Sequence, residues 1–273
     1  MAERSAPIDR SVFVRTSTLF EEKRRALSVD MIQNLARDIV RRVSNMQHVP
    51  KAVTVDPVSE ESVASFCHLL VRPSSAAALE FLEARVAEGV DHQVILHVYL
   101  AEAARVLGEQ WETDKISFVD VIHGTGHLYA ILRAVQARAG VGRSEGVQGR
   151  RALFAAVPDE THTFGVRLAA ETFREAGWSI ELKVGVDHEA LVDHVQRTMP
   201  DIIGLSLSTE ARLPNLVRLV VALRLVRPEA IIGVAPALNM DDAAIQAVTD
   251  IDIIFRDARQ AVRDLEWMLQ LRS

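Results

Sequence analysis

After residue 150 the sequence alternates short β-rich runs with segments of helical periodicity, and this alternation constrains the fold more than any other feature. The β-rich runs cover residues 152–157, 179–184, 201–206, 230–234 and 251–255, and the helical segments cover 165–176, 188–198, 214–226, 241–248 and 259–271. Repeated βα units predict a parallel sheet with helices on both faces, because parallel strands need crossover connections. We therefore expect residues 151–273 to form a five-stranded, doubly wound, Rossmann-like domain.

The loop after the first predicted strand carries the hexapeptide Glu160-Thr161-His162-Thr163-Phe164-Gly165. Right-handed crossovers place this loop at the carboxyl edge of the sheet, where open α/β sheets bind ligands. His162 there offers one nitrogen to a metal-containing ligand, Glu160 can hold the ring in one tautomer, and Gly165 lets a bulky group approach the backbone. The alternative is that His162 is an ordinary polar residue of a surface loop.

Two further loops reach the same edge of the predicted sheet. The third loop holds Ser206, Ser208 and Thr209, and the fourth begins at Gly233. One ligand could therefore touch all three loops. Hydroxyl groups after a strand are also common helix caps, so both roles stay open for the serines and the threonine.

The chain before the sheet is predicted to be helical. Between residues 57 and 140 we find four amphipathic segments, which start near residues 59, 74, 91 and 117. Short connections between such helices predict an antiparallel four-helix bundle. The glycine-rich stretch 141–150 is then a linker. For residues 1–56 we expect a flexible tail with one amphipathic helix, over 28–46, followed by a Pro-containing connection.

Composition narrows the class of protein. A net charge of -6 argues against a nucleic-acid-binding surface. The single cysteine, Cys67, excludes an internal disulfide, and no signal peptide or membrane-spanning run is present, so we expect a cytoplasmic protein. No nucleophile–base–acid constellation or P-loop is found, so we predict that the protein is not an enzyme.

A helical bundle, a glycine-rich linker and a sheet with acid-x-His-x-x-Gly on its first loop together resemble the cobalamin-binding module. The family pattern is Asp-x-His-x-x-Gly, then Ser-x-Leu after the third strand, then Gly-Gly after the fourth. The chain matches it with Glu160, His162, Gly165, Ser206 and Gly233, although Glu160 replaces the aspartate and the second glycine is a valine. The resemblance implies that His162 is the lower axial cobalt ligand, that Glu160 orients it, and that the serines, Thr209 and Gly233 line a cleft for the nucleotide tail.

The bundle segment points to one branch of that family. Trp111 is present as in the cobalamin photoreceptors, but their Glu-His pair is replaced by Val121 and Ile122. The run from residue 118 through residue 133 is more similar to the AerR/PpaA-type antirepressors of purple photosynthetic bacteria and to the haem- or cobalamin-binding domain of AppA. This resemblance implies a light-responsive transcriptional regulator, with adenosyl-, hydroxo- or aquocobalamin, that acts on a repressor protein and binds no DNA or membrane itself.

The upper side of the corrin has three candidate residues. Trp111 would cover it, with interhelix packing as the alternative. His123 and His127 are spaced i, i+4, which suits a metal shared by both or one upper axial ligand with a neighbour. We place His123 first for cobalt, and the alternative is a polar helix face.

Other functions stay open at this stage. A corrinoid carrier of a methyltransferase system would share the bundle, the histidine and the sheet. Haem could replace cobalamin on His162 in a redox sensor. Homodimer formation is also left open.

Overall fold

The computed structural model describes residues 8–46, 59–91, 94–140 and 150–272. The chain divides into two compact units, Met1–Val141 and Gly142–Ser273. The expected linkers at 48–58 and 141–149, the first seven residues of the expected tail, and His48 and His92 lie outside the described residues. No helix in the described ranges is both long and apolar enough to cross a membrane.

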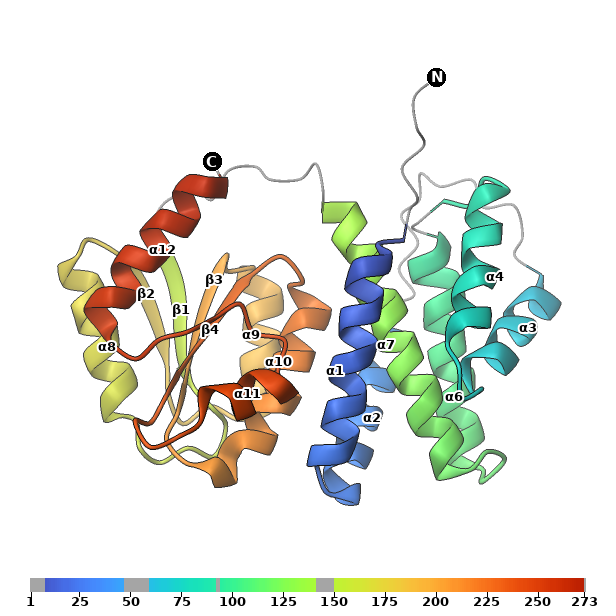
Figure 1. Ribbon diagram of the computed structural model, residues 1–273, viewed down its shortest axis with the longest axis horizontal. Coiled ribbons are helices and arrows are strands. Elements are labelled where there is room, and N and C mark those ends of the chain that lie inside the picture. The colour runs from blue at the N-terminus through green and yellow to red at the C-terminus, as the bar shows by residue number, and fades with distance from the viewer. Residues whose placement is uncertain (1–7, 47–58, 92–93, 141–149, 273) are drawn as a thin grey trace. The chain divides into compact units, whose positions relative to one another are not determined.

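The N-terminal unit is helical throughout its described residues (Figure 1). Its elements are α1 (Arg10–Ala26), α2 (Val29–Ser44), α3 (Glu60–Leu70), α4 (Ala76–Ala87), the π-helix η1 (Ile95–Leu100), α6 (Ala101–Glu112) and α7 (Phe118–Gly140). Helix α7 contacts α1, α2, α3, α6 and η1 and is therefore the centre of the unit. Helices form at each of the four places where the bundle pattern predicted them.

Helix α1 corrects the prediction of a flexible tail with a single helix. Asp9 caps it by accepting hydrogen bonds from the backbone N–H groups of Ser11 and Val12, at 3.0 and 3.2 Å. The buried ring of Phe20 lies against Gly126 of α7, where an added Cβ would come within 2.5 Å of it. The bundle therefore includes α1 and α2, because a glycine of α7 lets α1 approach closely.

The C-terminal unit contains the predicted sheet. Its strands are β1 (Arg151–Ala156), β2 (Ser179–Lys183), β3 (Ile202–Leu207), β4 (Ile231–Pro236) and β5 (Ile253–Ile254), all parallel, in the order β2-β1-β3-β4-β5. Its helices are α8 (Phe164–Glu175), α9 (His188–Thr198), the 3-10 helix η2 (Glu210–Arg212), α10 (Leu213–Val226), α11 (Asp242–Val248) and α12 (Ala258–Arg272). The predicted fold class, a helical bundle followed by a doubly wound sheet, is confirmed.

Each face of the sheet has its own hydrophobic core. On one face the alternate residues of β1, β3 and β4 pack against α9, α10 and α11. On the other face they pack against α8 and α12 (Figure 1). Burial on both faces explains why β3 and β4 read as nearly continuous apolar runs rather than as an alternation. The strand order changes direction between β1 and β3, so their carboxyl ends open onto the crevice where such folds bind ligands.

Candidate functional site: a histidine beside an apolar pocket

The loop after β1 has a fixed conformation. Asp159 adopts a left-handed backbone conformation, with φ of 66°. Asn215 of α10 donates its side-chain amide to the carbonyl oxygen of Pro158 at 3.1 Å and to the carboxylate of Asp159 at 3.0 Å. The loop is therefore held from the helix that follows β3, which is the rigidity that a ligand-binding loop needs.

Glu160 is the best-satisfied polar side chain of this loop. Its Oε1 accepts the backbone N–H of His162 at 2.9 Å, and its Oε2 accepts the backbone N–H of Ser208 at 3.1 Å and the hydroxyl of the same serine. Burial alone would raise the pKa of Glu160, but these hydrogen bonds outweigh it and hold the pKa at about 2. The side chain is an ionised, fixed acceptor at neutral pH.

His162 presents its ring to solvent, with 75% of the side chain exposed. Its Nδ1 lies 3.3 Å from Oε1 of Glu160. Since a carboxylate only accepts, it favours the tautomer with the proton on Nδ1, and this leaves the lone pair of Nε2 outward. A buried carboxylate behind an exposed imidazole is the arrangement that orients a histidine ligand toward a metal.

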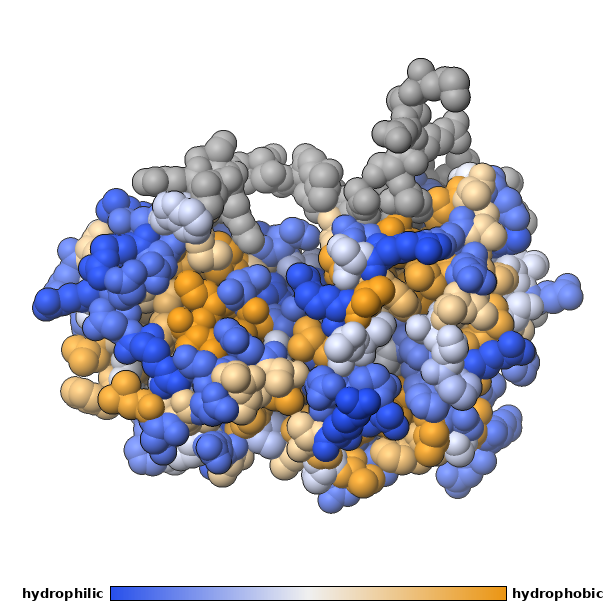
Figure 2. Space-filling view, in the orientation of Figure 1, coloured by the Kyte–Doolittle hydropathy of each residue, from blue (hydrophilic) through white to orange (hydrophobic). Residues whose placement is uncertain are grey.

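A pocket of about 360 Å³ opens beside His162. Its walls come from the start of α8, the carboxyl ends of β1, β3 and β4, and the start of α12. Phe164 and Leu168 of α8 line it and are 78% and 56% exposed, and Figure 2 shows hydrophobic residues (orange) at the surface of this unit. An apolar pocket beside an exposed ligand nitrogen suits a large, mostly apolar metal complex.

Two glycines lie side by side in the sheet next to this pocket. Gly204 of β3 pairs with Gly233 of β4. A Cβ on Gly204 would come within 2.8 Å of the ring of Phe154, and a Cβ on Gly233 would overlap the ring of Phe255. Phe154 and Phe255 are two of the aromatic residues that line the pocket, whereas Gly233 lies against Phe255 and does not line it.

The three hydroxyl side chains of the loop after β3 lie in three different environments. Ser206 lines the pocket, and its Oγ is buried without a hydrogen-bond partner among the described residues. Ser208 also lines the pocket but uses its hydroxyl to hold Glu160. Thr209 is exposed, does not line the pocket and makes no side-chain cap to the following helix. Ser206 is thus the serine of this loop that a ligand would satisfy.

The remaining predicted residues belong to the N-terminal unit. His123 and His127 face one pocket of about 520 Å³, between α1 and the turn from α3 to α4. Trp111 does not line that pocket, and the guanidinium of Arg37 lies 5.0 Å from the centre of its ring. The structure therefore brings the two histidines together but not the tryptophan with them, and a role at the upper side of a corrin stays a prediction for all three.

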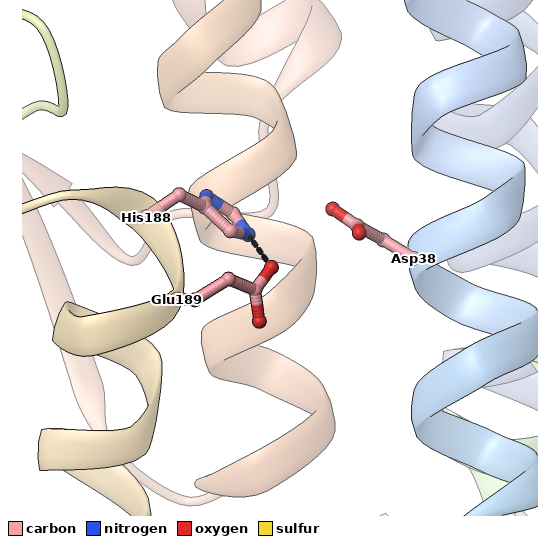
Figure 3. A group of neighbouring side chains, drawn as sticks. All are labelled: Asp38, His188 and Glu189. Carbon is pink, nitrogen blue, oxygen red and sulfur yellow. Dashed lines mark ion pairs between the residues drawn. The ribbon is translucent and has the colours of Figure 1, made fainter.

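Most other histidines of the described ranges have local protein partners. His188, at the first turn of α9, forms an ion pair with Glu189 at 3.9 Å (Figure 3). His194 of the same helix lies 2.9 Å from Glu181 of β2. His97 of η1 contacts the backbone carbonyl of Met46.

Sequence reasoning missed Asn215 and the aromatic lining of the pocket. The alternation of β1 could have shown that Phe154 shares a face with Ala152 and Ala156, toward α8. No local signal places Phe255 over Gly233, because the two residues meet only through the pairing of β4 with β5.

These residues fit a corrinoid. The chain offers one imidazole nitrogen for cobalt, held by a carboxylate. It also offers an apolar pocket and one buried hydroxyl, that of Ser206, without a hydrogen-bond partner among the residues that the structure describes. The charged groups at the pocket mouth have protein partners: Arg256 donates to the carbonyl oxygens of Ala237 and Met240, and Asp257 accepts from the backbone N–H of Gln260.

Comparison with known proteins also supports a corrinoid as the ligand. Residues 150–266 match the family model of the B12 binding domain. An uncharacterized 20.5 kDa protein in the bchF-crtJ intergenic region of Rhodobacter capsulatus is 26% identical over 180 residues, which cover 66% of this chain and 93% of that protein.

Two solved structures show a loose overall likeness. A cobalamin-binding protein from Desulfitobacterium hafniense superposes with a TM-score of 0.40 at 18% identity, covering 75% of this chain and 97% of that one. The monomethylamine corrinoid protein of Methanosarcina barkeri superposes with a TM-score of 0.39 at 16% identity, covering 77% and 99%. We draw no conclusion from superpositions this loose. The sequence match is the finding that characterises the C-terminal unit: residues 150–266 are similar to the B12 binding domain.

Proposed function

We propose that the C-terminal unit binds a corrinoid with Nε2 of His162 as the lower axial ligand of cobalt and the corrinoid's own base displaced. The observation that carries this proposal is the exposed ring of His162, held by buried Glu160 at the mouth of an apolar pocket. Neutral imidazole is a good ligand for cobalt, and the carboxylate behind it makes Nε2 the better donor.

The nucleotide tail of the corrinoid would enter the pocket. The displaced base would lie among the rings of Phe154, Phe173 and Phe255, which all line the pocket. The hydroxyl of Ser206 would donate a hydrogen bond to the base and so gain the partner that it lacks among the described residues. Thr209 and Gly233 have no direct part in this arrangement.

We further propose that the protein is a light-responsive regulator that acts through a repressor protein, with a bound adenosyl-, hydroxo- or aquocobalamin. When bound, an adenosyl corrinoid supplies the light response, because visible light breaks its cobalt–carbon bond. The name of the relative from Rhodobacter capsulatus places that protein between bchF and crtJ, which agrees with the antirepressor resemblance. The net charge of -6 favours a protein partner over direct DNA binding.

The rival function is that of a corrinoid carrier for a methyltransferase, because His162 and its pocket would serve a carrier equally well. The two functions differ in what responds to the corrinoid. A regulator changes the DNA binding of a repressor between light and dark, whereas a carrier gives and accepts a methyl group with a partner enzyme and shows no such change. We propose that the chain itself is not an enzyme in either function.

The first experiment measures pigment binding by His162→Ala. Purified wild type reconstituted with hydroxocobalamin is expected to show a base-off, histidine-ligated spectrum, whereas His162→Ala should lose most of the bound pigment while its circular dichroism stays unchanged. Thr161→Ser is the matched control, because it alters the neighbouring side chain but keeps the hydroxyl that lies 3.4 Å from Nδ1 of His162. Full retention of the pigment with an unchanged spectrum in His162→Ala would show that His162 is not the axial ligand. A haem spectrum from the expressed protein would show that the ligand is haem and not cobalamin.

The second experiment measures DNA retardation. The purified chain alone should not retard promoter DNA at physiological salt, but it should change the retardation caused by the repressor, and the change should differ between light and dark. Tight sequence-specific retardation by the chain alone contradicts the antirepressor role. Methyl transfer without any effect on a repressor would support the carrier instead.

A further inference from the structure

The N-terminal unit contains a second candidate metal site, separate from His162. His123 and His127 lie one helical turn apart on α7, with ring planes inclined by 7° and ring centroids 6.2 Å apart. Both line the pocket of about 520 Å³ between α1 and the α3–α4 turn. Two imidazoles that share one pocket are a chelating pair for a borderline metal ion.

The hydrogen bonding of His127 determines which nitrogen is available. Its Nδ1 lies 2.8 Å from the carbonyl oxygen of Leu70. A carbonyl oxygen only accepts, so Nδ1 carries the proton and the lone pair of the neutral ring is on Nε2. A backbone carbonyl behind a ligand imidazole is the usual way to fix it toward a metal.

The opposite wall of the pocket supplies oxygen atoms. Glu21 of α1 lines it. One carboxylate oxygen of Glu21 accepts from Arg24 at 2.6 Å. Ser17 also lines the pocket, and its Oγ is buried without a hydrogen-bond partner in the described part of the chain. An orphaned hydroxyl in a polar pocket is suited to hold a metal-bound water.

We propose that His123 and His127 bind a divalent transition-metal ion of the zinc class, with waters at the remaining positions, one of them held by Ser17. Two imidazole nitrogens and two oxygen ligands form a set that zinc accepts, at ~2.0–2.2 Å from each ligand atom. His127 keeps its hydrogen bond to Leu70, and His123 turns its ring toward Nε2 of His127 when the ion binds. All these residues belong to the N-terminal unit, so the site does not depend on a corrinoid.

The test is calorimetric titration of the corrinoid-free, tag-free full chain with Zn²⁺ after treatment with a chelator, repeated with Co²⁺ to record its visible absorption. We expect one ion per chain and a Co²⁺ spectrum typical of nitrogen and oxygen ligands. His123→Ala should weaken binding by about tenfold or more, since loss of a ligand costs at least as much as loss of its outer partner. His127→Gln is the second variant, because glutamine fills the partly buried position and can still donate to the carbonyl of Leu70.

Two controls separate this site from the others. His68→Ala removes an exposed histidine that lines a different groove of the same unit, and it should bind Zn²⁺ as wild type does. His162→Ala should also keep Zn²⁺ binding, even where it has lost the corrinoid. The proposal is overturned if the wild type binds no stoichiometric Zn²⁺, if His123→Ala and His127→Gln bind as wild type, or if binding follows His68 or His162 instead.

Discussion

Ser208 donates its backbone N–H and its hydroxyl to Oε2 of Glu160, a residue 48 positions earlier in the chain. The other carboxylate oxygen accepts from His162. One side chain thereby ties the loop after β3 to the loop after β1, and the exposed histidine takes its orientation from both loops. The candidate ligand is therefore positioned by two loops at the carboxyl edge of the sheet, not by its own loop alone.

Glu160→Gln should weaken corrinoid binding by about 10- to 100-fold, the usual cost of losing a residue that orients a ligand. The amide keeps the shape of the side chain but cannot accept from both Ser208 and His162 as the carboxylate does. The affinity is measured by absorbance titration with hydroxocobalamin. Asp159→Asn is the matched control, since it alters the adjacent acid, whose backbone conformation asparagine tolerates. Equal affinities for the two variants would show that Glu160 does not orient the ligand.

The lowered pKa of Glu160 makes the stability of the sheet unit depend on pH in the acid range. Its folded value of about 2 is below the ordinary 4.5, so the folded state holds the proton less tightly than the unfolded state. The stabilisation is thus fully present above about pH 4.5 and is lost as the pH falls toward about 2. Urea unfolding at about pH 5.5 and about pH 3 should show a smaller loss of unfolding free energy in Glu160→Gln than in wild type. An identical loss in both proteins would contradict the depressed pKa.

Gly165→Ala should separate binding from folding. No protein atom lies within 4 Å of a Cβ added at this position, and the residue lines the pocket in the first turn of α8. The thermal unfolding temperature should be unchanged or slightly higher, since alanine favours a helix by up to ~1 kcal/mol over glycine. Corrinoid affinity should fall by about tenfold where the ligand needs that space. Unchanged affinity would mean that the glycine serves only as a helix start.

Gly233→Ala, unlike Gly165→Ala, should destabilise the fold. The added methyl overlaps the ring of Phe255, so the variant should lose about 1–3 kcal/mol of unfolding free energy, as overpacked cores do. Measurement is by urea unfolding, with Gly165→Ala as the uncrowded control. The double variant Gly233→Ala, Phe255→Leu should recover part of the loss. If Gly233→Ala is as stable as wild type, the ring moves aside freely and is no fixed wall of the pocket.

The sheet unit could be predicted closely because its signals are local. Runs of β-branched and aliphatic residues alternate with amphipathic helices, and the histidine loop falls where the first strand ends. The division of labour among the hydroxyls could not be predicted, since Ser206, Ser208 and Thr209 are neighbours in sequence. Only their tertiary surroundings decide that one faces the pocket, one holds Glu160 and one is exposed.

Helix α1 shows why the N-terminal prediction was wrong. Its buried side chains are Phe13, Thr16, Phe20 and Lys23, and two of these four are polar. A search for apolar periodicity therefore finds little in this segment, although its packing against α7 is close. The polar members are buried by tertiary structure, which a pattern read along the chain does not contain.

The π-helical η1 has a consequence for where Trp111 points. A π turn takes up one residue more than an α turn, and each residue advances an α-helix by about 100° around its axis. The extra residue thus rotates all of α6 relative to an uninterrupted α-helix. Aligning this segment residue by residue with a relative that lacks the π turn would assign Trp111 to the wrong side of its helix. The side of α6 on which the indole of Trp111 lies is therefore set by the π-helix at Ile95–Leu100, more than ten residues upstream.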